Sequence, residues 1–278
     1  MKGVLMDIAS SAGQAGLDKN RTRVSVVTIS YNDADGLRRT AASVEGQLGE
    51  FELEHLIVDG GSRNFECPPL PDKDLFTRRF LSEPDQGRYD AMNKGIRMAT
   101  GDLVWFMHSS DVFTNDTALA TTLKHLTDPP AQWGYGLARL FDPRGQFHGA
   151  FGSAPFNLAR FSLGGKSIPH QAAFFGKNVL ASAGDYDLAH GLGADQLFMM
   201  KCATITPPIV VPHFLCDFDI TGAGTERPQR HHYKDMQAAR RALGLQVGPK
   251  FLDSTATACL TGIAVLKDLA SRQIRARQ

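Results

Sequence analysis

The chain has few cysteines, little net charge and no long apolar run, and each shortage excludes a class of protein. Its four cysteines lie far apart without a Cys-x-x-Cys spacing, which speaks against a zinc knuckle or redox pair and favours reduced thiols in a cytoplasmic protein. Thirty Lys and Arg against 29 Asp and Glu give a net charge of +1, so no global field attracts nucleic acid. No stretch approaches the ~20 apolar residues of a membrane span, and Asp7 comes too early for a secretory signal.

What remains is an ordinary globular composition over 278 residues, 42% hydrophobic and 21% charged. We expect residues 1–23 to be a mobile leader, residues 24–225 one domain and residues 226–278 a C-terminal helical extension. Within the domain the pattern changes after residue 111, giving halves 24–111 and 112–225. No Gly, Ser or Pro linker separates the halves, which favours one continuous body.

The first half alternates strands and helices. Strands are predicted for Val24–Ser30, HLIVDGG (55–61), RRFLSE (78–83) and Leu103–Met107. One helix is predicted behind the possible caps Asn32, Asp33 and Asp35, and another over residues 88–99. This alternation predicts an α/β fold with a mostly parallel sheet and helices on both of its faces.

The second half is less regular. We expect a helix over 112–128, a hairpin over 133–151 with its turn at 142–145, and a strand in SIPHQAAFF (167–175). A turn over 181–187 precedes a helix over 193–203, whose first turn carries Asp195. Residues 205–220 should be extended, and their prolines favour the edge of the sheet over its centre.

Every strand of the first half ends in polar residues. Tyr31 and Asn32 follow the first strand, Asp59 ends the second, Asp85 follows the third, and residues 108–111 follow the fourth. Ligands of open parallel sheets bind at the carboxyl edge, because the loops diverge there and helix N-termini direct their amides to it. The sequence therefore predicts a binding site at this edge.

A series of short motifs carries a family resemblance. In order along about residues 24–200 these are VSVVTISYN, LIVDGGS, SEPDQGRYDAMNKGI, ATGDLVWFMHSSD, PHQAAFF, GDYD and GADQLF. Together they resemble family 2 of the nucleotide-sugar glycosyltransferases, which has the GT-A fold. They are similar within it to the bacterial polysaccharide and glycolipid transferases of the colanic acid transferase group.

The resemblance implies an inverting, hexosyltransferase-type enzyme. Such an enzyme moves a sugar from a nucleotide-diphosphate sugar to a hydroxyl of a glycan or lipid-linked acceptor, in cell-surface polysaccharide or glycolipid synthesis. Residues 24–111 would be the nucleotide-binding half and residues 112–225 the acceptor half.

The resemblance also places the donor. Tyr31 would be a planar platform for the base and Asp59 its hydrogen-bond partner. The donor-binding residues it implies are Tyr31, Asn32, Asp59, Asp85, Gly87, Asp90, Asn93, Lys94 and Ser110. Taken singly, the residues allow plainer roles: Asp59 forms a turn, Asp85 caps a helix, and Asp90 and Lys94 form a surface pair.

The HSSD motif departs from the family, which has an acidic cluster of the D-x-D kind for a divalent cation. Only Asp111 is acidic here. One carboxylate is compatible with Mg²⁺, which takes phosphate oxygens and waters as further ligands, and Mn²⁺ accepts a histidine more readily. The alternative is that Asp111 caps a helix beginning near Phe113.

The resemblance makes Asp195 the general base for the acceptor hydroxyl, a role that an inverting displacement needs. The plainer alternative is an acid stabilised at a helix N-terminus, and Asp187 is the nearest competitor for the role. His170 and Gln171 are placed on the acceptor side by resemblance alone. His213 is a further candidate metal ligand, although a structural role is favoured.

The tail has apolar residues at Leu260, Ile263 and Leu266, followed by basic residues. The basic positions are Lys267, Arg272, Arg275 and Arg277. Such a helix either packs with a solvated face or lies on an anionic membrane, here the inner face of the plasma membrane.

Two rival functions stay open. A sugar nucleotidyltransferase would need a Gly-rich basic loop where the chain has SYNDADG (30–36). A catalytically inactive nucleotide-sugar-binding protein would explain the thin acidic cluster. The sugar, the base, the acceptor and the oligomeric state are not encoded in any motif.

Overall fold

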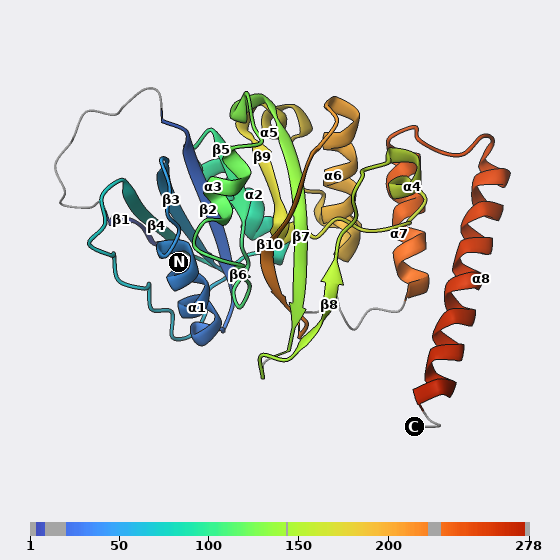
Figure 1. Cartoon of the computed structure of the whole chain (residues 1–278), viewed down its shortest axis with the longest axis horizontal. Coiled ribbons are helices and arrows are strands. Elements are labelled where there is room, and N and C mark those ends of the chain that lie inside the picture. The colour runs from blue at the N-terminus through green and yellow to red at the C-terminus, as the bar shows by residue number, and fades with distance from the viewer. Residues whose placement is uncertain (1–3, 9–20, 143, 222–228, 276–278) are drawn as a thin grey trace.

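The computed structural model describes residues 4–8, 21–142, 144–221 and 229–275, and these residues build one mixed sheet with helices on both faces (Figure 1). At its centre β2 (Arg23–Ser30), β3 (Glu52–Asp59), β4 (Phe76–Ser82) and β5 (Leu103–Phe106) run parallel in the order β4-β3-β2-β5. All eight residues of β3 are buried, as expected for a strand covered on both faces. The predicted α/β class with a mostly parallel sheet is confirmed.

The second half extends the same sheet. From β5 the order continues through β9 (Ala173–Gly176), β7 (Trp133–Phe141), β10 (Ile209–Asp219) and β6 (Val112–Phe113). β9 is antiparallel to both of its neighbours, whereas β10 is parallel to β7. β8 (Phe147–Phe151) forms the predicted hairpin with β7. Both halves of the chain therefore share one frame.

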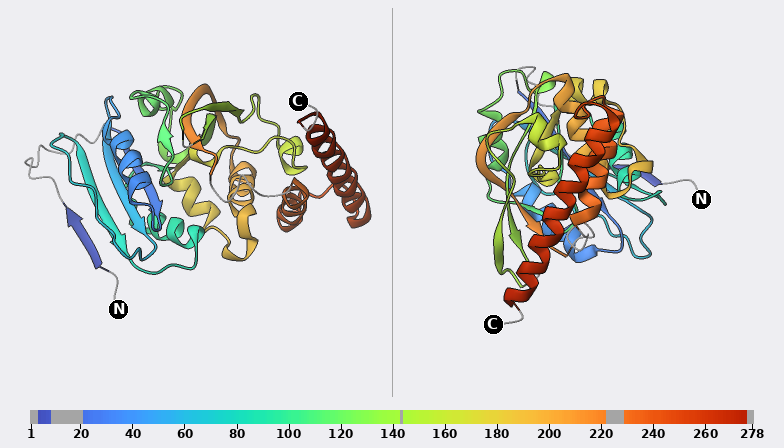
Figure 2. Two further views of the ribbon diagram at one scale, coloured as in Figure 1. Left: turned by 90° about the horizontal axis from the view of Figure 1, so that it is seen from below. Right: turned by 90° about the vertical axis from the view of Figure 1, so that its right-hand side faces the viewer.

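Helices cover the two faces of the sheet (Figure 2). α1 (Ala34–Glu45) and α3 (Ala118–Leu123) lie on one face. α2 (Arg88–Met98), α5 (Lys177–Ala183) and α6 (Ala194–Ile205) lie on the other. Successive side chains of β5 point to opposite faces of the sheet, as the strand period of two requires. Val104 and Phe106 pack in the core beneath α2, α5 and α6, whereas Leu103 and Trp105 pack in the core beneath α1 and α3. Shorter helical segments lie between these elements: the helix α4 (Leu158–Ser162) and the 3-10 turns η1 (Pro129–Ala131), η2 (His170–Ala172) and η3 (Leu188–Gly193).

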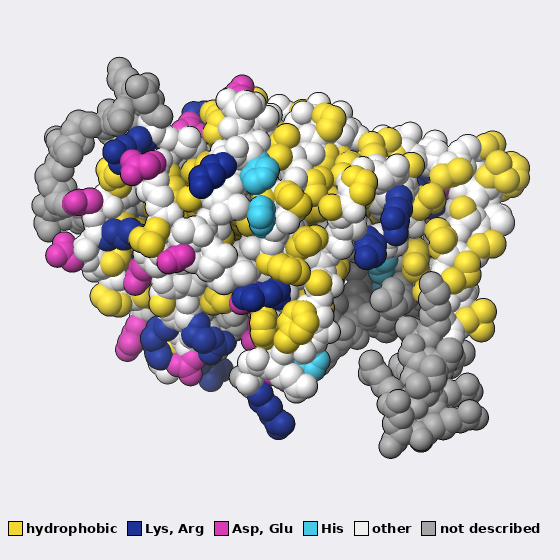
Figure 3. All heavy atoms as spheres, in the orientation of Figure 1, with side chains coloured by type: hydrophobic (Ala, Val, Ile, Leu, Met, Phe, Trp, Pro, Cys, Tyr) yellow, Lys and Arg dark blue, Asp and Glu magenta, His cyan; other side chains and the backbone are white. Residues whose placement is uncertain are grey.

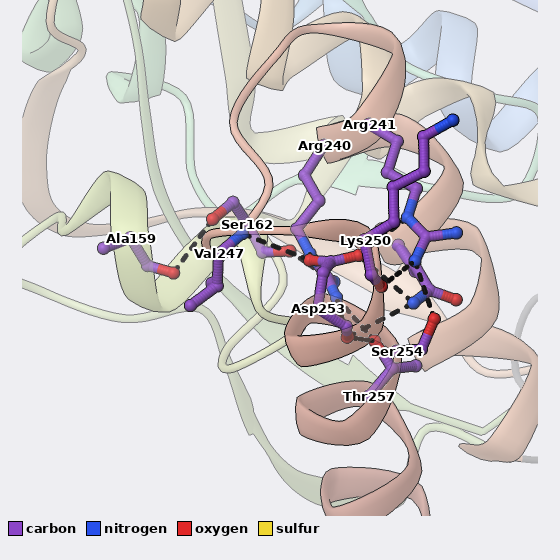
Figure 4. Close-up of polar contacts among 10 residues, drawn as sticks. Ala159, Ser162, Arg240, Arg241, Val247, Lys250, Asp253, Ser254 and Thr257 are labelled. Carbon is purple, nitrogen blue, oxygen red and sulfur yellow. Dashed lines mark hydrogen bonds and ion pairs between the residues drawn. The ribbon is translucent and has the colours of Figure 1, made fainter.

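The last two helices are joined by a buried ion cluster (Figure 4). α7 (Gln229–Ala242) packs on α6, and α8 (Lys250–Arg275) packs on α7. Asp253 of α8 is fully buried and accepts from Arg240 Nε at 2.5 Å and Arg241 Nε at 2.7 Å. Burial alone would raise its pKa, but the hydrogen bonds from Arg240, the Val247 amide and Arg241 lower the pKa of Asp253 to about 2. None of the helices within the described residues is both long and apolar enough to span a bilayer.

Two secondary-structure predictions for the second half are wrong. Residues 112–128 are not one helix, because Val112 and Phe113 pair with β10 and the Phe113 amide donates to Ser43 Oγ at 2.7 Å. The helix begins only at Ala118. In SIPHQAAFF, residues His170–Ala172 form a 3-10 turn and the strand begins at Ala173, while α5 takes the start of the expected turn over 181–187. Tertiary pairing decided both cases over local propensity.

The two ends of the sheet complete the comparison with the prediction. β10 is extended as expected and lies between β7 and β6, but β6 pairs only with Cys216 and Asp217. Among the described strands Pro212 therefore has β7 alone beside it, which agrees with the predicted edge position, and it falls where the register with β7 shifts, between Val210 and Phe214. Within the predicted mobile leader, β1 (Val4–Ile8) pairs antiparallel with β4, so the expectation is wrong for these residues. Residues 9–20 lie outside the described residues. The four cysteines are free thiols, as predicted.

Candidate functional site

Asp59 ties together the loops that follow β3 and β4. The carboxylate is fully buried at the carboxyl end of β3. It accepts hydrogen bonds from the amides of Gly61 (3.1 Å) and Ser62 (2.9 Å), and from the hydroxyls of Ser62 (2.5 Å) and Ser82 (2.7 Å). Both carboxylate oxygens are thus engaged within the protein. The turn-forming role, which the sequence left open beside base binding, is present in the structure.

The same loop reaches the end of β2. The Asn32 amide donates to Ser62 Oγ at 2.7 Å, and the Asn32 side-chain oxygen accepts from the Arg63 amide at 3.3 Å. Asn32 has φ +52°, a left-handed conformation that asparagine tolerates better than most residues. The chain is therefore turned sharply at the point where Tyr31 leaves the sheet.

Tyr31 presents a free aromatic surface, since its side chain is 67% exposed. A Cβ atom on Gly60 would lie 3.3 Å from the Tyr31 ring and 2.6 Å from a carboxylate oxygen of Asp85. A larger residue would require the Asp85 carboxylate to move. The predicted platform and Asp85 thus flank one short stretch of backbone.

Asp33 joins β2 to the loop after β5. Its carboxylate caps α1 through the Gly36 amide (3.0 Å) and accepts from the hydroxyls of Ser109 (2.5 Å) and Ser110 (2.9 Å). Burial raises the pKa of Asp33, but these hydrogen bonds and the Arg39 charge outweigh it, so the pKa is lowered. Ser110 has φ +79°, a strained backbone conformation of the kind found at functional sites.

Asp111 is a buried carboxylate with few partners. Its Oδ1 accepts from the Asp219 amide at 2.9 Å, and Thr40 holds the Asp111 carbonyl at 2.8 Å. Burial raises the pKa of Asp111 to about 8; hydrogen bonds from the Asp219 amide and Gln171 and the Arg88 charge oppose this, whereas the Asp219 charge adds to it. The alternative that Asp111 caps a helix beginning near Phe113 is wrong, because the strand β6 follows Asp111.

Two histidines lie beside Asp111. The rings of His108 and His170 are 5.6 Å apart, and Gln171 Nε2 contacts His108 Nδ1 at 3.3 Å. Burial lowers the pKa of both, so they are neutral at pH 7. His170 Nε2 contacts the Tyr186 hydroxyl at 2.8 Å, while His108 Nε2 and His170 Nδ1 are buried without a hydrogen-bond partner. Gln171 thus links this pair to Asp111.

Asp195 lies in the first turn of α6, where the sequence placed it. Its carboxylate accepts from the Gln196 amide at 2.7 Å and the Gln196 side chain at 3.3 Å. Burial raises the pKa of Asp195 to about 6, against the lowering effects of these bonds and of the Arg88 charge. The competitor Asp187 caps η3 through the Ala189 amide at 2.8 Å, which fits the plainer description of a turn acid.

Arg88 is the residue that sequence reasoning missed. It is exposed at the first position of α2, and its charge lowers the pKa values of His108, Asp111, His170 and Asp195. These four side chains come from three separate segments, so one cation relates the metal, base and acceptor-side candidates to each other. A cation at a helix N-terminus opposes the macrodipole. An arginine at the first position of a predicted helix is therefore the sequence signal that could have identified Arg88.

Two further predicted donor residues of α2, Lys94 and Asn93, support the protein around them. Lys94 Nζ bonds the Pro84 carbonyl at 2.9 Å and pairs with Glu83 at 3.0 Å and with Asp90 at 3.5 Å. Asn93 is buried and exchanges two hydrogen bonds with the Tyr186 backbone, at 2.8 and 3.0 Å. In this geometry both side chains are engaged within the protein.

Asp85 and Gly87 shape the same loop. Asp85 accepts from the Gly87 amide at 2.8 Å, and Gly87 has φ +107° and ψ 176°, which glycine alone adopts without strain. The helix itself has no side-chain cap from Asp85. The helix start is therefore set by Gly87.

No group of three or more His, Cys, Asp or Glu in the part of the chain that the structure describes could hold a metal ion unaided. His213 lies instead in a surface cavity of about 240 Å³ beside Thr114 and Thr121, its ring 6.0 Å from that of His125.

Comparison with known proteins gives close relatives in sequence. A family model described as Glycosyl transferase family 2 matches residues 25–175. The chain is 41% identical over 217 residues to an uncharacterized glycosyltransferase of Mycobacterium tuberculosis, covering 77% of this chain and 81% of that protein. It is 29% identical over 200 residues to the PGL/p-HBAD biosynthesis glycosyltransferase of the same organism, covering 69% and 73%.

Solved structures share the fold. The mannosyltransferase PcManGT from Pyrobaculum calidifontis, in complex with GDP-Man and Mn²⁺, matches with a TM-score of 0.60 at 19% identity, over 93% of this chain and 76% of that one. S. aureus TarS 1–349 in complex with UDP matches with a TM-score of 0.56 at 15% identity, over 85% and 70%. This chain spans 41% of the longer TarS chain that also matches. At these identities the likeness concerns the fold alone, and it confirms the fold class expected above.

The four hydrogen bonds that Asp59 accepts lead to a prediction about stability. Asp59→Ala removes the acceptor of four hydrogen bonds at a buried position and should lower the free energy of unfolding by about 2–4 kcal/mol in urea denaturation. Asp85→Ala, on the neighbouring loop, loses the hydrogen bond from the Gly87 amide at a half-buried position and should cost less than about 1 kcal/mol. Equal losses for the two variants would show that Asp59 does not organise the loops.

Proposed function

The chain belongs to glycosyl transferase family 2, and on that premise we propose that it is an inverting transferase. It moves a sugar from a nucleotide-diphosphate sugar to a hydroxyl of a glycan or lipid-linked acceptor. The observation that carries the proposal is the grouping of Asp111, Asp195 and two neutral histidines around the Arg88 charge. Family membership argues against the nucleotidyltransferase alternative.

The donor base is proposed to stack on Tyr31. Its exposed ring beside Gly60 and Asp85 offers the planar surface that a base needs. Asp59 remains the proposed base-recognising carboxylate, with Asn32 and Ser110 lining the same loops. Asp85 and Gly87 face the diphosphate in this proposal, while Asp90 and Lys94 hold the loop before α2 and Asn93 holds the backbone of Tyr186. Structural neighbours whose complexes contain UDP and GDP-Man support a nucleotide-sugar donor.

A divalent cation fits the residues present only in part. Asp111 is a buried carboxyl whose pKa of about 8 leaves it mostly protonated at pH 7 until a cation binds, and His108 Nε2 has no hydrogen-bond partner among the described residues. Asp111 would hold Mg²⁺ or Mn²⁺, with donor phosphate oxygens completing the ligands. When bound, the ion would neutralise charge on the diphosphate. The neighbour solved with Mn²⁺ supports the same choice.

The chain's own residues carry the displacement. The acceptor oxygen forms a bond to the anomeric carbon as the bond from that carbon to the phosphate oxygen breaks. The hydroxyl proton passes to Asp195, whose pKa of about 6 leaves it ionised at pH 7 yet basic enough to accept a proton. The electron pair leaves with the diphosphate, where Arg88 offers a fixed positive charge. Lys94 is not assigned this role, because its ammonium is tied to Glu83 and Asp90.

The acceptor is proposed to be a glycolipid or cell-surface glycan. The mycobacterial relative named for PGL/p-HBAD biosynthesis supports this class. His170 and Gln171 remain the proposed acceptor-side residues, and the transfer of a hexose, a colanic-acid-type relationship and a cytoplasmic location at the inner membrane face remain predictions.

Asp195→Asn tests the base. Turnover, measured as release of nucleoside diphosphate from UDP-, GDP- and dTDP-sugars with Mn²⁺, should fall about 10²–10⁴-fold while donor affinity stays within about twofold. In the wild type, kcat/KM should fall as the pH drops below about 6, because the protonated carboxyl cannot accept a proton. Asp187→Asn is the matched control and should keep activity within a few-fold. Full activity of Asp195→Asn would move the base elsewhere, and absence of turnover with every donor would favour the binding-protein alternative.

Asp111→Ala tests the metal role. Calorimetric titration of the wild type with a nucleoside diphosphate should show tighter binding with Mn²⁺, by about tenfold or more, and EDTA should abolish the gain. The variant should lose that gain. Asp142→Ala, in the remote β7–β8 turn, should retain it. An unchanged Mn²⁺ response in Asp111→Ala would contradict the assignment.

Arg88→Met tests the leaving-group cation. Because the Arg88 charge lowers the pKa of Asp195, its removal should shift the acidic limb of the kcat/KM profile to higher pH as well as weakening donor binding. Lys94→Met removes a cation of the same helix but should leave the position of that limb unchanged. If Arg88→Met kept both the wild-type limb and the wild-type donor affinity, Arg88 would not face the reacting groups.

A further inference from the structure

Over residues 251–266, whose side chains the structure describes, the outer face of α8 is apolar and has no partner. Between Phe251 and Leu266 the only charged residue is Asp253, which is buried against α7. The buried stripe of the helix consists of Asp253, Thr257 and Ala264. On the opposite side the exposed apolar residues are Phe251 (67% exposed), Leu252 (47%), Ile263 (51%) and Leu266 (68%). We call these four residues the α8 apolar face.

The face lies at one end of the molecule. β1 and α8 occupy opposite ends in the left view of Figure 2, and in the right view α8 lies in front of the body, nearest the viewer. Hydrophobic side chains are spread along the described part of α8 at the right of the space-filling view (Figure 3). The ion cluster of Asp253 with Arg240 and Arg241 fixes which side of the helix turns outward (Figure 4). A surface could therefore meet the whole length of this face without touching the sheet.

Positive charge is concentrated in the C-terminal segment that contains α7 and α8. Residues 229–278 contain nine Lys and Arg against three Asp, a net charge of +6, whereas residues 1–228 contain 21 against 26, a net charge of −5. Lys250 precedes the apolar face, and Lys267, Arg272 and Arg275 follow it on the same helix. The side chains of these last three lie outside the described residues, as does Arg277 altogether. A near-neutral protein thus carries one strongly basic end.

We propose that the α8 apolar face docks on an anionic lipid surface. A helix with an aliphatic and aromatic face, flanked by basic residues, lies in the interface with its apolar side chains among the acyl chains and its cations near lipid phosphates. Nucleic acid would require cations on the outer face itself, and the exposed positions from Phe251 to Leu266 carry none. The occupant that matches both the apolar face and the +6 charge is an anionic bilayer.

Docking at this end would leave the carboxyl edge of the sheet free. α8 is held to the body through α7, which packs on α6, and α6 carries Asp195 in its first turn. The membrane contact is thus connected to the catalytic body through three packed helices. The proposal goes beyond transfer chemistry and does not require a particular sugar or acceptor.

Vesicle co-sedimentation of the full chain tests the proposal. Wild-type protein should bind vesicles of mixed phosphatidylcholine and phosphatidylglycerol, bind phosphatidylcholine alone much more weakly, and be released as salt is raised. The double variant Phe251→Ser/Leu266→Ser should bind the anionic vesicles at least about tenfold less. The matched control Leu48→Ser/Phe147→Ser removes two exposed apolar side chains elsewhere and should bind as the wild type does.

Three results would overturn it: no binding to anionic vesicles, equal binding by the α8 double variant, or equal loss in the control variant. Light scattering separates the main competitor, because a wild-type dimer that the α8 double variant converts to monomer, without vesicle binding, would make this face a protein interface. The assay needs no turnover, so its failure is independent of the proposed sugar transfer.

Discussion

Two carboxylates at the strand ends hold the binding edge together. Asp59 gathers the loops after β3 and β4, and through Ser62 it reaches Asn32 after β2. Asp33 then joins that loop to Ser109 and Ser110 after β5. Four parallel strands thus end in one hydrogen-bonded belt of loops. Each of these carboxylates accepts several hydrogen bonds from loop amides and hydroxyls in place of water. Loops that would otherwise diverge are therefore ordered before any ligand binds.

This belt explains the electrostatics beside it. With the β5 loop fixed, Asp111 is held in a buried position that raises its pKa to about 8, and the neutral histidines add no positive charge that would lower this pKa. Arg88 faces this group from a helix start that disfavours cations. A carboxyl that needs a nearby cation to be ionised at pH 7 and an exposed arginine suit a ligand that brings both anionic phosphate and its own cation, which is the character of a metal-bound nucleotide diphosphate.

The sequence predicted the parallel half of the sheet and the polar loops at its carboxyl edge, because buried strands and polar strand ends leave strong local signals; that a ligand binds there stays a prediction. It could not distinguish a donor ligand from a loop support: Lys94 and Asn93 carry suitable chemistry, but their partners Glu83 and Tyr186 are fixed only by packing. The prediction of one helix over residues 112–128 was wrong for the same reason. Val112 and Phe113 form a strand only because they pair with β10, about a hundred positions away. Arg88 was missed because its significance lies in side chains brought to it from three other segments.

The most direct measurement of the central claim is hydrogen–deuterium exchange with and without a nucleoside diphosphate and Mn²⁺. If the strand-end loops and the start of α6 surround one ligand, amides in residues 82–90, 107–111, 168–172 and 193–196 should all gain protection together, at one ligand concentration. Protection limited to a single one of these segments would contradict the account, because the acids would then open onto separate surfaces.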